Sequence, residues 1–306
     1  MRSPFIPLYR RQFILGPRPI TNCQDWTVST VESDFWLTTH PDLEVCIVSE
    51  GTRIVAVLGS PLSSQNPGER CEDIARRLVS AGPSALNELA GRWVIVFVHP
   101  EGVHVYHDIA GYRQVLYSLT DSWCASSAGL LGLAMPLILD EEAASYIDRV
   151  KSEMTEPWWP AGMSRFRKVK LLLPNHYLDL RGRVAVRYWP EDEREELPYD
   201  EVSDRAANTI KGIMLAAKQR FSLALAITAG LDSRMILSAC RDFTDEVLFF
   251  THLIYDLNQD SPDIRIPAEM LKSCGKKRIL IGLPGEVDSA VAQDFRTAAG
   301  RLFTPR

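Results

Sequence analysis

The strongest constraint on the fold is a regular alternation of β-type and helix-type segments in the last third of the sequence. Short runs of small and β-favouring residues are separated by stretches whose apolar residues recur every three or four positions. Such alternation is typical of βαβ units, in which helices join parallel strands by right-handed crossovers. We therefore predict an α/β domain with a parallel sheet. Its expected elements are a helix over 199–219 capped by Asp200, strands over 223–227, 247–252 and 278–283, and helices over 233–240 and 262–273.

The sequence before residue 190 has a different rhythm and predicts a β-rich α+β domain. Pairs of apolar runs flank short turns, and each pair is expected to form a hairpin or a neighbouring pair of strands. The acidic segment 191–198, Glu-Asp-Glu-Arg-Glu-Glu-Leu-Pro, contains few apolar residues and ends in proline, so we place a domain boundary there, between residues 1–190 and 191–306. The expected strand pairs lie in 44–59, 92–111, 114–134 and 169–190 (around Arg181 and Gly182), with helices in 71–82 and 140–154.

The turn after the strand 223–227 has the composition of an anion site. Its sequence is Thr-Ala-Gly-Leu-Asp-Ser over residues 228–233. Ligands of parallel sheets bind beyond the carboxyl ends of the strands, where the N–H groups of the next helix attract negative charge. Because Asp232 would repel a phosphate unless a divalent cation lay between them, the pattern indicates a magnesium-bound polyphosphate. Spacing alone leaves a second interpretation open, a tight turn in which Asp232 stabilises the start of a helix.

The loop 228–233 resembles the Ser-Gly-Gly-x-Asp-Ser pyrophosphate loop of asparagine synthetase-like proteins, with Thr and Ala in its first two positions. The segment 249–275, after the loop, and the segment 171–190, before it, resemble the same family. Residues 89–118 resemble the strand pair and turn of its glutamine amidotransferase domain. The residues that match this turn are Asp108, Gly111, Arg113 and Tyr117, whereas Val115 replaces a proline. The resemblance implies an Ntn-hydrolase-like N-terminal domain of stacked β-sheets, followed by an α/β PP-loop domain of the adenine nucleotide alpha hydrolase-like kind.

The same resemblance implies a chemistry and a set of site residues. Such proteins use ATP and Mg²⁺ to adenylate a carboxylate with release of pyrophosphate, and an amine then attacks the acyl-adenylate to form an amide. Asp232 would bind Mg²⁺. The residues implied to hold ATP are Thr228, Ala229, Gly230, Leu231, Asp232 and Ser233 around the pyrophosphate, with Ala226 and Thr251 beside adenine and ribose. The carboxylate substrate would be aspartate, a sugar acid or a peptide side chain.

Two departures from the family qualify this expectation. Glutamine-hydrolysing members use an N-terminal cysteine, whereas this sequence begins Met1-Arg2-Ser3 and its first cysteine is Cys23, so we expect no glutaminase activity. The synthetase region is also shorter than in the family. We expect a truncated, split or degenerate member, completed by a second chain or a homodimer if it is active. The alternatives are a pseudoenzyme, a nucleotide-binding subunit of a lasso-peptide or β-lactam-type cyclase, and another PP-loop chemistry such as tRNA thiolation.

Composition limits the other classes of partner. The net charge of −5 gives no electrostatic case for nucleic-acid or membrane binding. The sequence contains no run of about 18 apolar residues, so we predict no membrane span. Six scattered cysteines without a Cys-x-x-Cys pair favour reduced thiols and a cytoplasmic protein. Asp260, Ser261 and Asp263 follow the second parallel strand, where they either neighbour the nucleotide cleft or cap the next helix.

Overall fold

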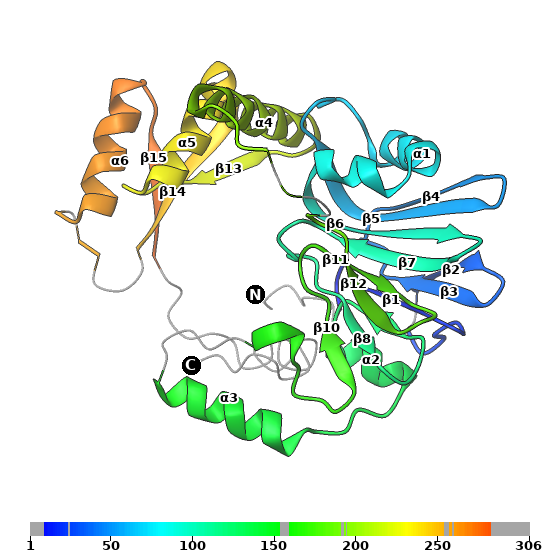
Figure 1. The fold of residues 1–306 in the computed structure, drawn as a ribbon. Helices are drawn as coiled ribbons and strands as arrows, with labels where there is room; N and C mark the ends of the chain where they lie inside the picture. The colour runs from blue at the N-terminus through cyan, green and yellow to red at the C-terminus, as the bar shows by residue number, and fades with distance from the viewer. Residues whose placement is uncertain are drawn as a thin grey trace.

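The chain is a mixed α+β protein with two antiparallel sheets and one parallel sheet (Figure 1). The computed structural model describes residues 9–282 apart from 24, 154–158, 191, 192, 194, 254–256 and 259. Met1 to Ser3, Leu283 and the sequence after it therefore lie outside the described residues. No helix within the described ranges is long and apolar enough to cross a membrane.

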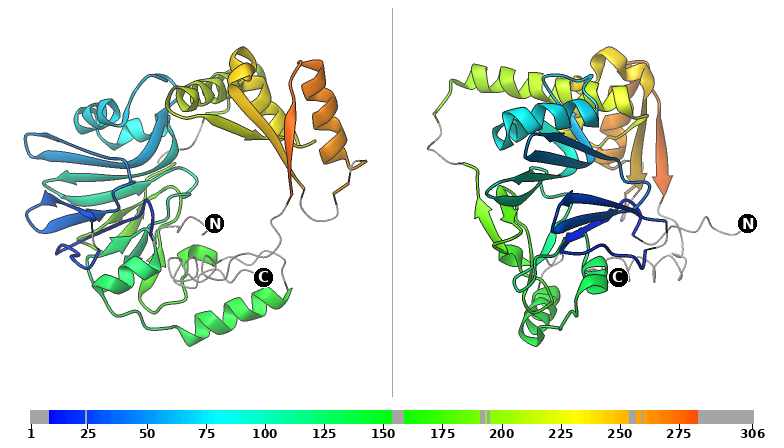
Figure 2. Two further views of the ribbon diagram at one scale, coloured as in Figure 1. Left: turned by 180° about the vertical axis from the view of Figure 1, so that it is seen from behind. Right: turned by 90° about the vertical axis from the view of Figure 1, so that its right-hand side faces the viewer.

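The N-terminal part consists of two six-stranded antiparallel sheets that lie one over the other (Figure 2). The first sheet has the order β10 (Val169–Leu171), β8 (Leu116–Ser118), β9 (Cys124–Ala125), β1 (Phe13–Gly16), β3 (Phe35–Thr39), β2 (Thr27–Glu32). The second has the order β12 (Val184–Arg187), β11 (His176–Asp179), β7 (Gly102–His107), β6 (Leu89–His99), β5 (Arg53–Ser63), β4 (Val45–Glu50).

Alternation along the strands builds a four-layer structure, because successive side chains of a strand point to opposite faces. In β6, Val94 and Val96 point into the core between the two sheets, whereas Trp93 and Ile95 point to the outer face. That outer face is covered by α1 (Cys71–Ala81) and the 3₁₀ helix η1 (Pro83–Glu88). The outer face of the first sheet is covered by α2 (Ala128–Ala134). Farther along the chain are α3 (Glu141–Glu153) and the short η2 (Pro160–Gly162).

Most of the expected N-terminal elements are confirmed, and one segment contains a strand that was not expected. β4 and β5 form the hairpin expected in 44–59, β6 and β7 form that expected in 92–111, and β8 pairs with β9. In the segment 169–190, the two strands expected around Arg181 and Gly182 are β11 and β12, which pair with each other, and β10 is an additional strand before them. Pro174 has no N–H for a ladder, and Asn175 takes a left-handed backbone conformation with φ of 65°. The chain therefore leaves the first sheet after β10 and enters the second at β11.

The C-terminal part contains the predicted parallel sheet. Its elements are α4 (Tyr199–Arg220), β13 (Leu223–Ala226), α5 (Leu231–Ala239), η3 (Arg241–Glu246), β14 (Val247–Leu253), α6 (Pro262–Ser273) and β15 (Arg278–Gly282). The strands run parallel in the order β13-β14-β15. The expectation that Asp200 caps the first helix is wrong: Pro198 holds the cap position without a side-chain hydrogen bond, and Asp200 lies in the first turn. There its charge faces the positive end of the helix dipole.

The three long helices that the structure describes in this part pack on one face of the sheet. Side chains from α4, α5 and α6 meet Leu225 and Phe249 in a single apolar cluster. The opposite face carries Ala226, Leu248 and Ile279, which are exposed among the described residues. Parallel sheets are normally covered on both faces. The described part of the chain therefore contains one covering layer of this sheet.

The helix α4 joins the two parts of the molecule. It lies against β5 and also packs on the covered face of the parallel sheet (Figure 1). At its end, Arg220 donates to the carbonyl oxygen of Pro61 and forms an ion pair of 2.6 Å with Glu44. In its middle, Gly212 approaches the backbone of Ser64 so closely that an added Cβ would lie 2.0 Å from the Ser64 carbonyl oxygen. These contacts hold the start of the parallel sheet against the two antiparallel sheets of the N-terminal part, which form a β-sandwich.

Candidate functional site

The loop 228–233 lies at the carboxyl end of the parallel sheet. β13 ends at Ala226, and the buried Ile227 still donates its N–H to the carbonyl oxygen of Phe250 in the neighbouring strand. Helix α5 begins at Leu231, so the turn between strand and helix is short. This is the position at which open α/β sheets bind their ligands.

The hydroxyl groups of Thr228 and Ser233 stabilise the loop through hydrogen bonds to its own backbone. Ser233 Oγ accepts the N–H of Thr228 at 3.1 Å and lies within hydrogen-bonding distance of the carbonyl oxygens of Thr228 and Gly230. Thr228 Oγ1 accepts the N–H of Gly230 at 3.2 Å. The two hydroxyls of the predicted site therefore organise the backbone, and the N–H of Ala229 is the loop donor that points to a group from another element.

That group is a carboxylate. Asp263, in the first turn of α6, accepts the N–H of Ala229 at 2.9 Å across 34 positions of sequence. A carboxylate oxygen at this distance shows that the loop can present a backbone donor to an oxygen anion. Ser261 occupies the helix-cap position but makes no capping bond with its side chain, and Asp260 donates its own N–H to the side chain of Asn258. Of these three expected neighbours, Asp263 is the one whose side chain bonds to the loop.

Asp232 is an exposed carboxylate in the first turn of α5. It makes no hydrogen bond or ion pair with any residue that the structure describes. Asp232 and Asp263 thus both adjoin the loop, and carboxylate oxygens are the ligands that Mg²⁺ prefers. The described residues contain no group of three or more possible metal-binding side chains. A magnesium ion here would therefore complete its shell with phosphate oxygens and water, as Mg²⁺ does at nucleotide sites.

The two residues implied to contact adenine and ribose occupy different environments. Ala226 is exposed on the uncovered face of the sheet. Thr251 is 1% exposed, and its hydroxyl donates to the carbonyl oxygen of Ile227 at 2.7 Å while accepting a bond from Arg278 at 2.9 Å. The buried Thr251 therefore stabilises the backbone immediately before the loop. Arg278 was not among the expected site residues, since nothing in the sequence indicates that the first residue of β15 reaches β14.

The segment 108–113 forms a tight turn after β7. Asp108 is 1% exposed, and its two carboxylate oxygens accept the N–H groups of Tyr112 and Arg113 at 2.9 and 2.8 Å. Gly111 has a left-handed φ of 66°, which a residue with a side chain adopts only with strain.

Cys23 lies elsewhere and is partly buried, which raises the pKa of its thiol. A raised pKa lowers the thiolate fraction and disfavours a nucleophilic role.

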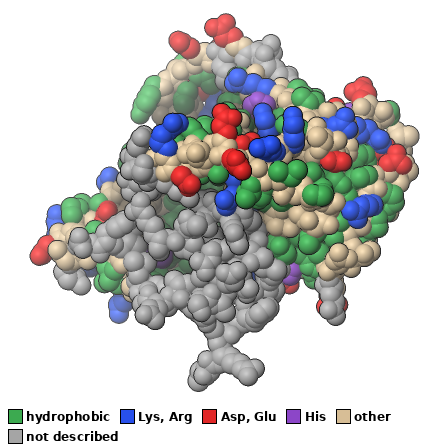
Figure 3. Space-filling view, turned by 90° about the horizontal axis from the view of Figure 1, so that it is seen from below, with side chains coloured by type: hydrophobic (Ala, Val, Ile, Leu, Met, Phe, Trp, Pro, Cys, Tyr) green, Lys and Arg blue, Asp and Glu red, His purple; other side chains and the backbone are tan. Residues whose placement is uncertain are grey.

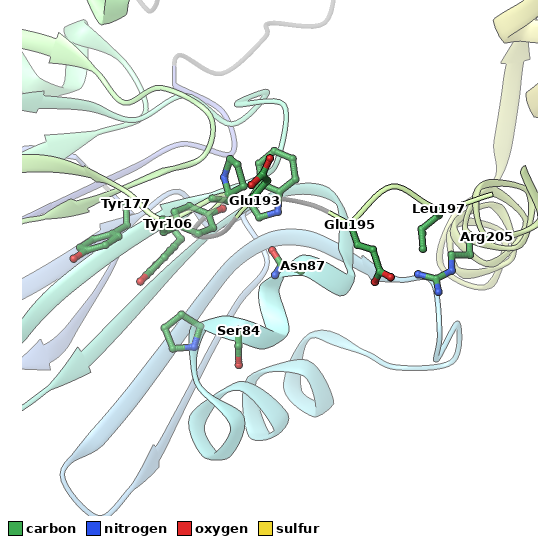
Figure 4. A pocket seen from close by; sticks show the side chains of 12 residues that line it. Ser84, Asn87, Tyr106, Tyr177, Glu193, Glu195, Leu197 and Arg205 are labelled. Atoms are coloured by element: carbon green, nitrogen blue, oxygen red, sulfur yellow. The ribbon is translucent and has the colours of Figure 1, made fainter. Parts of the chain in front are cut away.

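A cavity of about 760 Å³ lies between the second sheet and α4 (Figure 4). Tyr106 and Tyr177 line one end of it, and Glu195 and Arg205 point toward one another at the other end. On the face shown in Figure 3, acidic and basic side chains are intermixed, and neither sign dominates the part that the described residues form. These features identify no ligand by themselves.

No protein-family model matches the sequence. The search of curated proteins finds no match either.

Proposed function

We propose that the chain binds Mg-ATP at the loop 228–233 and supports asparagine synthetase-like formation of an amide bond. The observation that carries the proposal is the bond from the Ala229 N–H to the carboxylate of Asp263, at the carboxyl end of a parallel strand. This geometry presents a backbone donor to an oxygen anion where a phosphate group would bind.

The architecture supports the finer assignment of the fold. Two stacked antiparallel sheets with helices on both outer faces suit an Ntn-hydrolase-like, amidotransferase-type domain. The alternating parallel unit suits the first part of a PP-loop domain. Within that unit a pyrophosphate oxygen would replace the Asp263 oxygen at the Ala229 N–H, beside the start of α5. Asp263, released from the loop, and Asp232 would then serve as carboxylates for Mg²⁺. Thr228 and Ser233 would keep the loop rigid.

The proposed reaction has two steps. A carboxylate oxygen of the substrate attacks the α-phosphorus of ATP, and pyrophosphate leaves. An amine then attacks the acyl carbon, AMP leaves and a proton is released. The part assigned to the loop is to stabilise the negative charge that develops on the leaving pyrophosphate.

One observation favours a second candidate, a subunit that binds the nucleotide without completing the reaction. Among the described residues β13 pairs with β14 alone, and one face of the parallel sheet carries no covering helix. A cleft at the edge of β13 would then need walls from outside the described residues, and in this candidate a second chain supplies them. Binding of ATP without turnover would be the behaviour of such a subunit.

The direct test combines binding and product release for wild type and two variants. We expect calorimetric binding of Mg-ATP by wild type, with affinity at least about tenfold weaker in Asp232→Ala, a loss of about 1.4 kcal/mol. The matched control is Asp204→Ala, which removes an exposed carboxylate of α4 and should leave binding unchanged. Pyrophosphate release with aspartate and ammonium would distinguish the synthetase from the binding subunit. Wild-type protein that does not bind Mg-ATP would contradict both candidates.

A further inference from the structure

We propose that a second pocket, in the N-terminal part, binds a small molecule through its carboxylate or phosphate group, with Arg92 and Arg113 as the recognising side chains and Arg11 beside them. The pocket has a volume of about 860 Å³ and lies between the start of β1, the β5–β6 pair and the turn after β7. This size is typical of small-molecule sites. The proposal is independent of the nucleotide loop, since none of these residues belongs to the parallel sheet.

Arg113 is held in the wall of the pocket from two sides. The buried carboxylate of Asp108 fixes the backbone of its turn, and Arg113 Nη1 donates to the carbonyl oxygen of Arg11 at 2.9 Å. Gly59, with a left-handed φ of 96°, makes room for the guanidinium: an added Cβ would lie 2.9 Å from Arg113 Nε and 2.5 Å from the carbonyl oxygen of Arg92. The fold thus places this cation by specific contacts.

The guanidinium groups of the pocket form no ion pair with a described residue, although the carboxylate of Asp108 lies close enough to Arg113 to favour its charge. Arg92 donates to the carbonyl oxygen of Tyr112 at 3.2 Å, and Arg113 Nε is buried without a hydrogen-bond partner. Within the described ranges, none of Arg11, Arg92 and Arg113 forms an ion pair. Burial, followed by the charge of Arg92, lowers the pKa of Arg113 to about 10, so the side chain remains charged at neutral pH.

The carboxylates along the pocket wall are already engaged. Asp42 pairs with Arg10 at 2.7 Å, and Glu44 pairs with Arg220 at 2.6 Å. Arg92 and Arg113 are therefore available to a ligand, and the buried guanidinium of Arg113, which Arg92 repels, gains most from an added anion. Guanidinium groups bind carboxylate and phosphate with directed hydrogen bonds.

The other residues that line the pocket indicate the chemistry of the rest of the ligand. Amide and hydroxyl groups come from Gln12, Gln114 and Ser60, and apolar surface comes from Leu62 and Phe221. A molecule with one oxyanion and a short, partly apolar body fits this lining. Phe221 follows α4, so the pocket lies where the helix that leads into the parallel sheet meets the sandwich.

The test measures binding of two probes, inorganic phosphate and succinate, by titration calorimetry in a buffer without other polyvalent anions. We expect saturable binding of at least one probe, weakened about tenfold or more in Arg92→Gln and in Arg113→Gln. Phosphate alone would indicate a phosphate ester as the ligand, and succinate alone a carboxylate. The matched control is Arg53→Gln, an exposed arginine at the other end of β5 without an ion pair to a described residue, which should bind as wild type does.

Two further measurements keep the test decisive. Arg92 is exposed, so its variant is expected to fold even if Arg113→Gln does not. Binding that persists in Asp232→Ala and Ser233→Ala would separate this pocket from the nucleotide loop. The proposal is overturned if neither probe binds to wild type, or if Arg92→Gln and Arg53→Gln bind equally well.

Discussion

At the scale of single residues, one hydroxyl oxygen connects the two ends of the loop 228–233. Ser233 Oγ accepts the N–H of Thr228 and can donate to either of two carbonyl oxygens of the loop. Substitution of Ser233 by alanine removes this oxygen and leaves the partly buried N–H of Thr228 without a partner. The geometry of the predicted anion site therefore depends on a residue that is not its main donor.

We expect Ser233→Ala to lower the free energy of unfolding by about 1–2 kcal/mol, the usual cost of an unsatisfied polar group. Urea unfolding measures this change. The control is Ser238→Ala on the same helix, whose side chain is exposed and makes no hydrogen bond to a described residue, so its effect should stay within about 0.5 kcal/mol. Equal effects of the two substitutions would show that the loop does not need the Ser233 hydroxyl.

His107 gives a residue-scale prediction for pH. Its side chain is 1% exposed, with Nε2 3.0 Å from the carbonyl oxygen of Leu173. Burial lowers its pKa, and this outweighs the opposing effects of that hydrogen bond and of Asp108. The unfolded state, with a pKa of about 6.5, therefore binds more protons than the folded state once the pH falls below that value. Stability present above about pH 6.5 is lost as the pH decreases.

Urea unfolding at pH 7.5 and pH 5.5 tests this directly. Wild type should lose more stability over this interval than His107→Gln, in which the titrating group is absent. His252→Gln, at an exposed position of β14, should lose as much as wild type. If His107→Gln retains the full pH dependence, the loss arises from other groups.

At the scale of elements, β14 combines a covered and an uncovered side. Phe249 is 2% exposed and packs in the cluster formed with α4, α5 and α6, whereas the adjacent Leu248 is 49% exposed. The difference follows from the alternation of side chains along a strand and from the placement of all three helices on one face.

Phe249→Ala is therefore expected to cost about 3–5 kcal/mol of unfolding free energy, and Leu248→Ala less than about 1 kcal/mol. Denaturant unfolding of both variants provides the comparison. Because the two residues are neighbours in one strand, a change in β propensity alone would affect them similarly. A similar cost at both positions would mean that the second face is covered as well.

Sequence patterns predicted the elements better than their partners. The helix over 262–273 and the alternation after residue 199 follow from apolar periodicity, which is local information. No local pattern singles out the strands β1, β2 and β3. The pair expected around Arg181 and Gly182 is confirmed, but the separate strand β10, which pairs with β8 in the other sheet, is not among the expected elements. The pairing of these strands is decided by which sheet can bury their side chains, and Pro174 with Asn175 redirects the chain between sheets. That choice depends on contacts distant in sequence.

At the scale of the whole molecule, the same limit applies to the site. Composition indicated an anion-binding turn at 228–233, but the bond between Ala229 and Asp263 joins residues 34 positions apart. The basic pocket is less predictable still, since Arg11 and Arg113 meet across 102 positions. Neither contact has a local pattern, because each results from how strands and helices pack. The covered and uncovered faces of the parallel sheet likewise follow from topology.

The central claim is that the loop 228–233 binds the phosphates of Mg-ATP, and amide hydrogen exchange followed by mass spectrometry tests it most directly. Saturating Mg-ATP should slow exchange in peptides that contain the loop and the start of α5, and leave the peptides of α1 unchanged. The same protection should be lost in Asp232→Ala and kept in Asp204→Ala. Unaltered exchange in the loop at saturating Mg-ATP, or protection confined to the turn around Arg113, would contradict the claim.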